Sequence, residues 1–167
     1  MVKKRVLDTS KIPMPGEGKR GEQGYLAYLL RQANAAVRVS FDRALANLDV
    51  TLPQFSALQM ICAYGELSSA ELARLTYLTP QTMNIIVKNL ETRGAIERAP
   101  HSEHGRIIWL KATAVGRRLL SQCRTRVDLI EAKLQACAEI PAQENAVRHF
   151  LALVAKTFDP GADADRR

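Results

Sequence analysis

The sequence predicts a mainly α-helical chain that carries one small β-hairpin. Apolar residues recur at helical spacing in six segments between residues 23 and 158. Residues that commonly cap helices precede four of these segments, at Thr51, Ser68, Thr79 and Thr113. Between residues 95 and 110 the pattern changes to two short β-prone runs around a polar tip. Together these observations predict a set of helices with a hairpin placed before the last two.

The composition predicts a soluble globular protein. Of the 167 residues, 47% are hydrophobic and 25% are charged. No apolar run approaches the roughly 18 residues that a membrane-spanning helix needs, and the N-terminus lacks the apolar stretch of a secretory signal. We therefore expect a cytoplasmic protein with no membrane partner. The net charge of +7 suggests a polyanionic partner, although the basic residues are spread along the whole chain.

The three cysteines predict neither a disulfide framework nor a metal site. Cys62, Cys123 and Cys137 are scattered, and none has the spacing of a zinc ligand. All three fall on apolar helix faces, where a free cysteine is usually a small buried hydrophobic residue. The hairpin tip 101–106 contains two histidines and a glutamate, but a metal site needs supporting contacts that such a tip lacks. We expect no metal and no cofactor, and no phosphate loop or nucleophile motif indicates an enzyme.

The first half of the chain divides into an arm and three helices. Residues 1–22 mix proline, glycine and charged residues and are predicted to be a flexible basic arm. Residues 23–50 contain a long amphipathic helix. The spacing of Thr51 and Gln54, and of Ser68 and Glu71, predicts a capping box at the start of each of the next two helices.

A helix-turn-helix is predicted where the helix after Ser68 meets the next helix. Thr79 is its expected cap and Pro80 its first residue, where the missing N–H has no cost. The helix has one apolar face, which we expect to be buried and which consists of Met83, Ile86, Val87 and Leu90.

The second half is predicted to hold the hairpin and two further helices. Residues 95–98 and 107–110 are the expected strands. Thr113 then begins a long helix whose apolar seam from Gly116 to Cys137 alternates steps of four and three, a spacing that requires a helical neighbour. Pro141 begins the last helix.

A helix-turn-helix followed by a β-hairpin is a winged helix, and in this setting the chain resembles the MarR family of bacterial transcription regulators. The resemblance covers roughly residues 23–158. It rests on the ordered motifs Leu52-Pro-Gln54-Phe-x-x-Leu58, Ser68-x-x-Glu71-Leu72-Ala73, Thr79-x-x-Thr82, Val87-Lys-Asn-Leu90-Glu91-x-Arg93-Gly94, Ile96-Glu97-Arg98 and Ala112-Thr113-x-x-Gly116.

The resemblance assigns a role to each segment. It implies a winged helix-turn-helix DNA-binding domain over 51–113, flanked by dimerisation helices at 23–50 and 114–158 and a tail at 159–167. It also implies a homodimer that binds a pseudo-palindromic operator on double-stranded DNA, most often as a repressor, and that a small ligand releases. The wing departs from the family pattern Asp-x-Arg, because the matching positions hold His104, Gly105 and Arg106.

In a helix-turn-helix, the second helix enters the major groove and its outward side chains meet the bases. Thr79 and the two serines at the preceding helix start suit phosphate oxygens, although capping explains two of the three equally well. Arg106 is placed for the minor groove, and His104 is either a phosphate contact or a solvated loop residue. The predicted DNA-binding residues are Ser68, Ser69, Thr79, Gln81, Thr82, Asn84, Ile85, Lys88, His104 and Arg106.

The helices outside the winged helix offer more apolar surface than this small unit can cover, so we expect them to form the dimer interface. The predicted interface residues are Leu120, Cys123, Val127, Ile130, Leu134, Phe150, Leu151 and Val154.

An effector site is predicted from aromatic residues and one arginine. Tyr25, Tyr28 and Arg31 are close together on the first long helix, and Tyr64 ends the second helix. Such a set suits an aromatic carboxylate or an acyl thioester, although packing aromatics and a solvated arginine explain it too. Two alternatives stay open: a winged-helix module for protein interaction without specific DNA binding, and a regulator controlled by cysteine oxidation.

Overall fold

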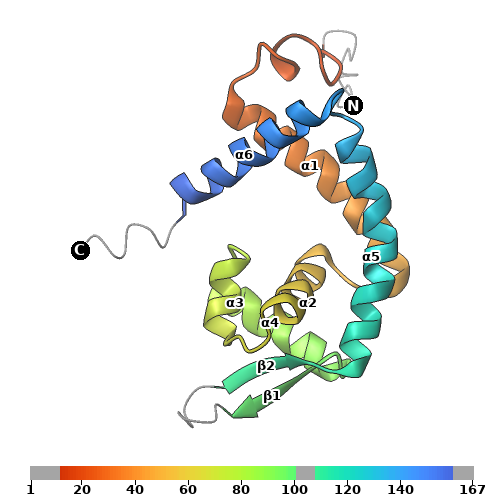
Figure 1. The fold of residues 1–167 in the computed structure, drawn as a ribbon, viewed down its shortest axis with the longest axis vertical. Coiled ribbons are helices and arrows are strands. Elements are labelled where there is room, and N and C mark those ends of the chain that lie inside the picture. Colours follow the sequence, from red (N-terminus) through yellow and green to blue (C-terminus); the bar gives the residue numbers. More distant parts are fainter. Residues whose placement is uncertain (1–11, 101–107, 160–167) are drawn as a thin grey trace, which may run out of the picture. The chain divides into compact units, whose positions relative to one another are not determined.

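The structure is a computed structural model that describes residues 12–100 and 108–159 (Figure 1). The chain divides into two compact units, Met1–Ser40 and Phe41–Arg167, which are described separately. Helix α1 (Leu26–Leu45) begins in the first unit and ends in the second. No helix among the described residues is long and apolar enough to cross a membrane.

The described start of the first unit is a series of turns ahead of α1. A short 3₁₀ helix, η2 (Gly18–Arg20), lies within it. The Arg20 guanidinium donates to the carbonyl oxygen of Pro13 at 2.7 Å and to Oε1 of Gln32 on α1 at 3.1 Å. Arg20, predicted as part of a flexible arm, is therefore hydrogen-bonded to α1 in this structure.

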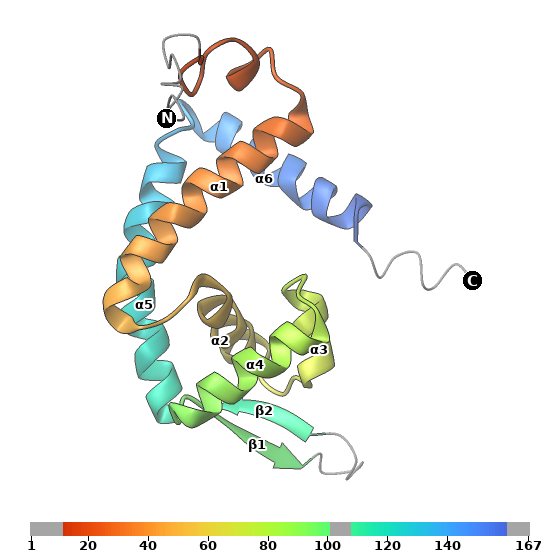
Figure 2. The ribbon, with the colours of Figure 1, turned by 180° about the vertical axis from the view of Figure 1, so that it is seen from behind.

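The second unit contains the winged helix, built from α2 (Leu52–Tyr64), α3 (Ser69–Leu75), α4 (Pro80–Thr92), β1 (Ile96–Pro100) and β2 (Ile108–Ala112). Both ribbon views show α3 beside α4, with the hairpin at one end of the three helices (Figures 1 and 2). The strands pair antiparallel, with Ile96 opposite Ala112 and Pro100 opposite Ile108. A bridge between Leu67 and Leu110, which the sequence did not predict, joins the turn before α3 to the hairpin.

The helix starts are formed by the side chains that the sequence predicts. Thr51 and Ser68 each form a capping box with the residue three positions later. The Thr79 hydroxyl accepts from the N–H of Thr82, and the Thr113 hydroxyl accepts from that of Gly116. These predictions are confirmed.

The last two helices are α5 (Ala114–Gln135) and α6 (Pro141–Thr157), and a 3₁₀ turn, η3 (Ala46–Leu48), follows α1. The first half of the α5 seam packs against the winged helix of the same chain. Leu120, Cys123 and Val127 are 4%, 0% and 6% exposed. Their place in the predicted dimer interface is therefore corrected, because they are already buried within their own chain.

The core of the second unit joins all of its winged-helix elements to α5. It contains residues from the end of α1, from each of α2 to α4 and from both strands. Its largest fully buried side chains are Leu45, Leu58, Ile61, Leu72, Met83, Val87, Leu90, Leu110 and Cys123.

Candidate nucleic-acid interface and ligand pocket

The outward face of α4 is set by the residues on its inward face. Met83, Val87 and Leu90 are fully buried and Ile86 is 6% exposed, so the helix is fixed about its axis. The opposite face then points to solvent. Its exposed side chains are those predicted to meet bases or phosphates, Gln81, Thr82, Asn84, Ile85 and Lys88.

Ser68 is fully engaged as a cap at the start of α3. Its hydroxyl donates to the Glu71 carboxylate at 2.6 Å and accepts from the Glu71 N–H at 3.2 Å. Its backbone N–H also donates to that carboxylate, at 2.8 Å. These bonds leave Ser68 without a free donor for a phosphate, and the Glu71 carboxylate would repel one.

The other polar residues of this face form two local pairs. The hydroxyls of Thr79 and Thr82 are 2.9 Å apart, in addition to the capping bond between these residues. The Ser69 hydroxyl donates to Oδ1 of Asn84 at 3.0 Å, which connects α3 to α4. Sequence reasoning missed this second pair, because the two residues are 15 positions apart. His104 and Arg106 of the predicted wing lie outside the described residues.

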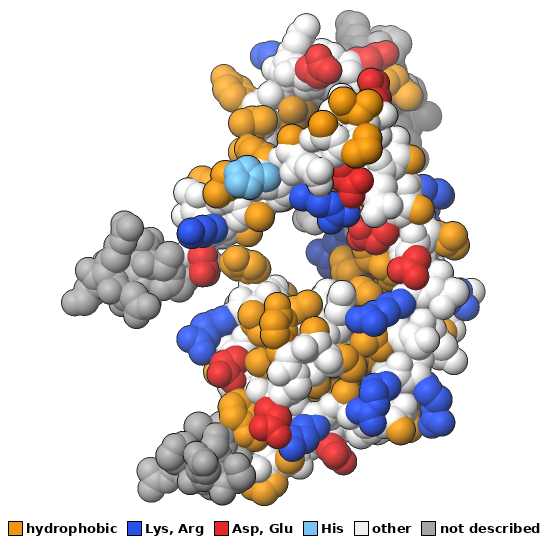
Figure 3. Space-filling model, in the orientation of Figure 1, with side chains coloured by type: hydrophobic (Ala, Val, Ile, Leu, Met, Phe, Trp, Pro, Cys, Tyr) orange, Lys and Arg blue, Asp and Glu red, His pale blue; other side chains and the backbone are white. Residues whose placement is uncertain are grey.

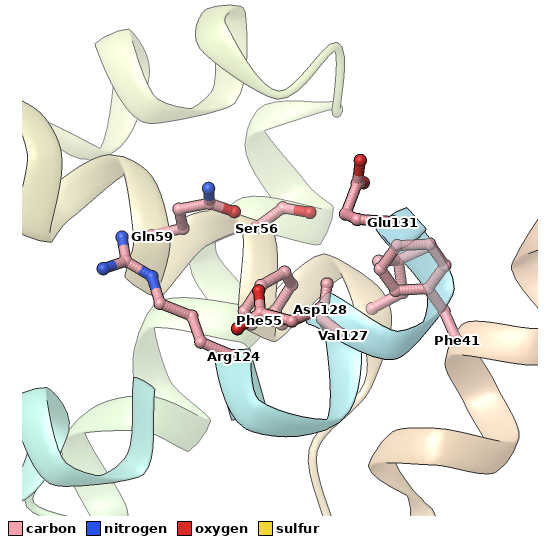
Figure 4. Close-up of a pocket in the computed structure, with 9 residues that line it drawn as sticks. Phe41, Phe55, Ser56, Gln59, Arg124, Val127, Asp128 and Glu131 are labelled. Carbon is pink, nitrogen blue, oxygen red and sulfur yellow. The ribbon is translucent and has the colours of Figure 1, made fainter. Parts of the chain in front are cut away.

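A cavity of about 390 Å³ lies between α2, α5 and the end of α1, all within the second unit. Its floor is apolar, with Phe41 9% and Phe55 5% exposed. Figure 4 shows Arg124 extending toward Gln59 of α2 at one end of the pocket and Phe41 at the other. The lining residues are Phe41, Leu52, Phe55, Ser56, Gln59, Arg124, Val127, Asp128 and Glu131.

The predicted effector residues do not line this cavity. Tyr25, Tyr28 and Arg31 belong to the first unit, where the Arg31 guanidinium stacks 5.3 Å from the centre of the Tyr28 ring. Tyr25 is 87% exposed and Tyr64 is 65% exposed, so neither forms a pocket wall in its own unit. Arg124, Asp128 and Glu131 are spaced along one face of α5, and this spacing was the sequence signal for the pocket that the prediction did not use.

Three charged side chains give the pocket its chemistry. Arg124, Asp128 and Glu131 are all exposed, and among the described residues none forms an ion pair. The guanidinium can hold a carboxylate through two parallel hydrogen bonds, while the carboxylates accept from hydroxyl or amino groups. One positive and two negative groups around an aromatic floor fit a ligand with one acid group and one donor group.

The remaining predicted interface residues are accessible to different degrees. Ile130 and Val154 are half-buried, whereas Leu134, Phe150 and Leu151 are 40%, 40% and 47% exposed. Helix α6 has no buried residue, and hydrophobic side chains are spread along it in Figure 3.

The cysteines differ in accessibility, which corrects one expectation. Cys123 is buried and Cys62 is half-buried, but Cys137 is exposed because it follows the end of α5. Burial raises the pKa of the Cys62 and Cys123 thiols, against the opposing effect of nearby arginines.

Comparison with known proteins agrees with this architecture. A model described as MarR family matches residues 48–107. The chain is also 37% identical over 123 residues to the HTH-type transcriptional repressor Rv2887 of Mycobacterium tuberculosis, covering 74% of this chain and 88% of that protein. This chain belongs to the MarR family. Its winged helix is the DNA-binding fold of a family of transcription regulators.

Solved structures show the same MarR fold. The crystal structure of Rv2887 from Mycobacterium tuberculosis in complex with salicylic acid matches with a TM-score of 0.64 and 36% identity, covering 79% of this chain and 98% of that one. CouR from Rhodococcus jostii RHA1, bound to p-coumaroyl-CoA, matches with a TM-score of 0.73 at 23% identity, covering 83% of this chain and 94% of that one. The second likeness concerns the fold alone.

Proposed function

We propose that this MarR family protein is a repressor that binds a pseudo-palindromic operator as a homodimer in the cytoplasm. The observation that carries the proposal is the outward face of α4, where four polar side chains and Ile85 are exposed while the opposite face is locked in the core. A helix held in this way can enter the major groove and present amide and hydroxyl groups to base edges.

Ser68 is not among the proposed DNA contacts, because both of its donors are used in the capping box. Gln81, Thr82, Asn84 and Ile85 are the proposed base contacts, and Thr79 and Lys88 the proposed phosphate contacts. Ser69, predicted as a phosphate contact, is not among them because its hydroxyl donates to Asn84. The proposed wing contacts, His104 and Arg106, come from the sequence. Two copies are needed because one short helix reads too few base pairs, and a two-fold dimer reads a repeated half-site.

The pocket between α2 and α5 is the proposed effector site. Its volume falls in the range of about 300–1,000 Å³ that is usual for small-molecule sites, and its apolar floor suits an aromatic ring. Arg124 is the proposed partner of a ligand carboxylate. Asp128 and Glu131 disfavour a second negative charge, so we expect aromatic monocarboxylates with a hydroxyl or amino group to bind better than dicarboxylates.

The test begins with the full chain and a random duplex library. We expect enrichment of an inverted repeat whose half-site centres are separated by about one helical turn, or by a multiple of it. Arg106→Ala should then weaken binding to every sequence and reduce the slope of log affinity against log salt by about 1. Equal affinity for all duplexes would overturn the proposal in favour of a protein-interaction module.

The ligand half of the proposal is tested on the selected operator. Titration with salicylate should release the labelled duplex, because DNA and salicylate bind different conformations of the protein. Salicylate should also raise the melting temperature of the free protein, because it binds the folded state. Phthalate, which carries a second carboxylate on the same ring, is the matched control and should have little effect at the same concentration. Stronger release by phthalate would overturn the assigned pocket chemistry.

A further inference from the structure

One hydrogen bond connects the exposed face of α4 to the preceding helix. The Ser69 hydroxyl donates to Oδ1 of Asn84 at 3.0 Å. Ser69 is the first residue of α3 and is half-buried, whereas Asn84 is exposed on α4. The amide therefore has one end attached to α3 and the other end turned away from that bond.

The bond determines which chemical group Asn84 offers to a partner. A carboxamide has an acceptor oxygen and an amide nitrogen that carries two donor hydrogens. Because Ser69 takes one of the two lone pairs of the oxygen and holds that oxygen toward α3, the nitrogen with its two hydrogens is the end directed away from α3. Met83 and Val87 are both 0% exposed, which fixes α4 about its axis and keeps the Asn84 backbone beside α3.

We propose that Ser69 is a positioning residue that makes Asn84 a hydrogen-bond donor in the major groove and so sets the base that it reads. The inference rests on the proposed DNA-binding function. A free asparagine pairs with adenine through both its oxygen and its nitrogen. The bond holds the oxygen toward α3, and two-bond pairing with adenine needs both amide atoms to face the base, so that pairing requires the amide to leave Ser69. Guanine instead offers two adjacent acceptors, N7 and O6, to the amide nitrogen.

The experiment measures base preference in the operator selected by the wild-type protein. Asn84→Ala identifies the position that Asn84 reads, as the position where the preference disappears. Duplexes with each of the four base pairs there are then titrated by fluorescence anisotropy against wild type, Ser69→Ala and Ser69→Thr. We expect wild type to favour guanine over adenine by about tenfold, the size of one good base contact.

If Ser69 is a positioning residue, its substitution should change the base preference without changing the salt dependence of DNA affinity. Ser69→Ala should remove most of the guanine preference by freeing the amide to pair with adenine, while the salt slope stays at the wild-type value. Ser69→Thr keeps a hydroxyl at the same position and should restore the preference. In an Asn84→Ala background, Ser69→Ala should have no further effect.

Gln81→Ala supplies the matched control, since Gln81 is exposed on the same helix and is not bonded to Ser69 in the structure. The effects of Ser69→Ala and Gln81→Ala should be additive, whereas those of Ser69→Ala and Asn84→Ala should not. Equal loss of affinity for all four bases with a shallower salt slope would make Ser69 a phosphate contact and overturn the inference. Selection of no sequence by wild type would instead overturn the proposed function, and the inference with it.

Discussion

Gly116 on α5 approaches Ala95 so closely that a Cβ atom at position 116 would clash with the Ala95 carbonyl oxygen. The same oxygen accepts from the backbone N–H of Thr113 at 3.0 Å and from its hydroxyl at 3.2 Å. Gly116 therefore belongs to the joint between α5 and the start of the hairpin, and this joint sets where α5 leaves the winged helix.

Gly116→Ala should destabilise the protein by about 2–3 kcal/mol, because backbone atoms must move to admit the methyl group. At a solvent-exposed helix position, the same substitution stabilises a protein by about 1 kcal/mol. The sign of the change in unfolding free energy therefore distinguishes a close approach from an open position. The measurement is urea unfolding followed by circular dichroism. Val115→Ala, at a neighbouring position that is 45% exposed, should change the stability by less than about 0.5 kcal/mol. A raised midpoint for Gly116→Ala would refute the close approach.

The capping box of α3 should make stability depend on pH. Hydrogen bonds from the Ser68 hydroxyl, and then from its backbone N–H, lower the pKa of Glu71 in the folded protein. A lowered folded pKa stabilises the fold above the unfolded pKa of about 4.3, and the contribution is lost as the pH falls through the folded value. The unfolding midpoint of wild type should therefore exceed that of Glu71→Gln near neutral pH, and the gap should close as the pH falls below about 4. The same substitution at exposed Glu97 should leave the midpoint unchanged, and a gap that persisted in acid would contradict the assignment.

Arg124→Gln should abolish the response to salicylate without unfolding the protein. A ligand at a hundredfold its dissociation constant stabilises the native state by about 2.7 kcal/mol, which shifts the melting temperature by a few degrees. The variant should lose this shift while its own melting temperature stays close to wild type, since Arg124 is exposed. Arg118→Gln, an exposed arginine of α5 outside the pocket lining, is the control and should respond as wild type does. An undiminished shift in Arg124→Gln would place the ligand elsewhere.

Phe150→Asp should convert the proposed dimer to monomer. Phe150 and Leu151 are 40% and 47% exposed in the single chain, and an exposed apolar helix face of this kind is typical of an interface. A carboxylate placed there would be buried without a partner in the dimer. Sedimentation at micromolar concentration provides the measurement. Ala152→Asp introduces the same charge at another exposed position of α6 and should stay dimeric; a wild-type monomer would refute the proposed assembly.

The three thiols should react in two groups with a disulfide reagent. Cys137 is exposed and should react rapidly, whereas the raised pKa and reduced access of Cys62 and Cys123 should delay their reaction until the protein unfolds. Cys137→Ser should therefore remove the fast phase, which absorbance of the released thiolate measures. If oxidation controls DNA binding, this variant should resist oxidative release from DNA. Oxidative release that survives in Cys137→Ser would assign control to Cys62 or Cys123.

Local chemistry in the sequence was enough to predict the helix starts and the inward face of α4. A threonine or serine whose hydroxyl accepts from the N–H three residues later needs only its neighbours, so the caps at Thr51, Ser68, Thr79 and Thr113 were predictable. The helical period likewise determined that Met83 would be buried and Asn84 exposed, because both positions are set by one helix against one core.

Only the tertiary structure decided what each exposed or buried side chain meets. The seam of α5 has the same spacing whether its neighbour is its own chain or a second copy, so periodicity could not show that Leu120 is buried within one chain while Leu134 stays 40% exposed. The pocket around Arg124 and the bond between Ser69 and Asn84 combine residues from separate helices. Backbone periodicity and capping act over a few residues, whereas these contacts depend on how whole helices pack, and that is the physical reason the sequence alone did not reveal them.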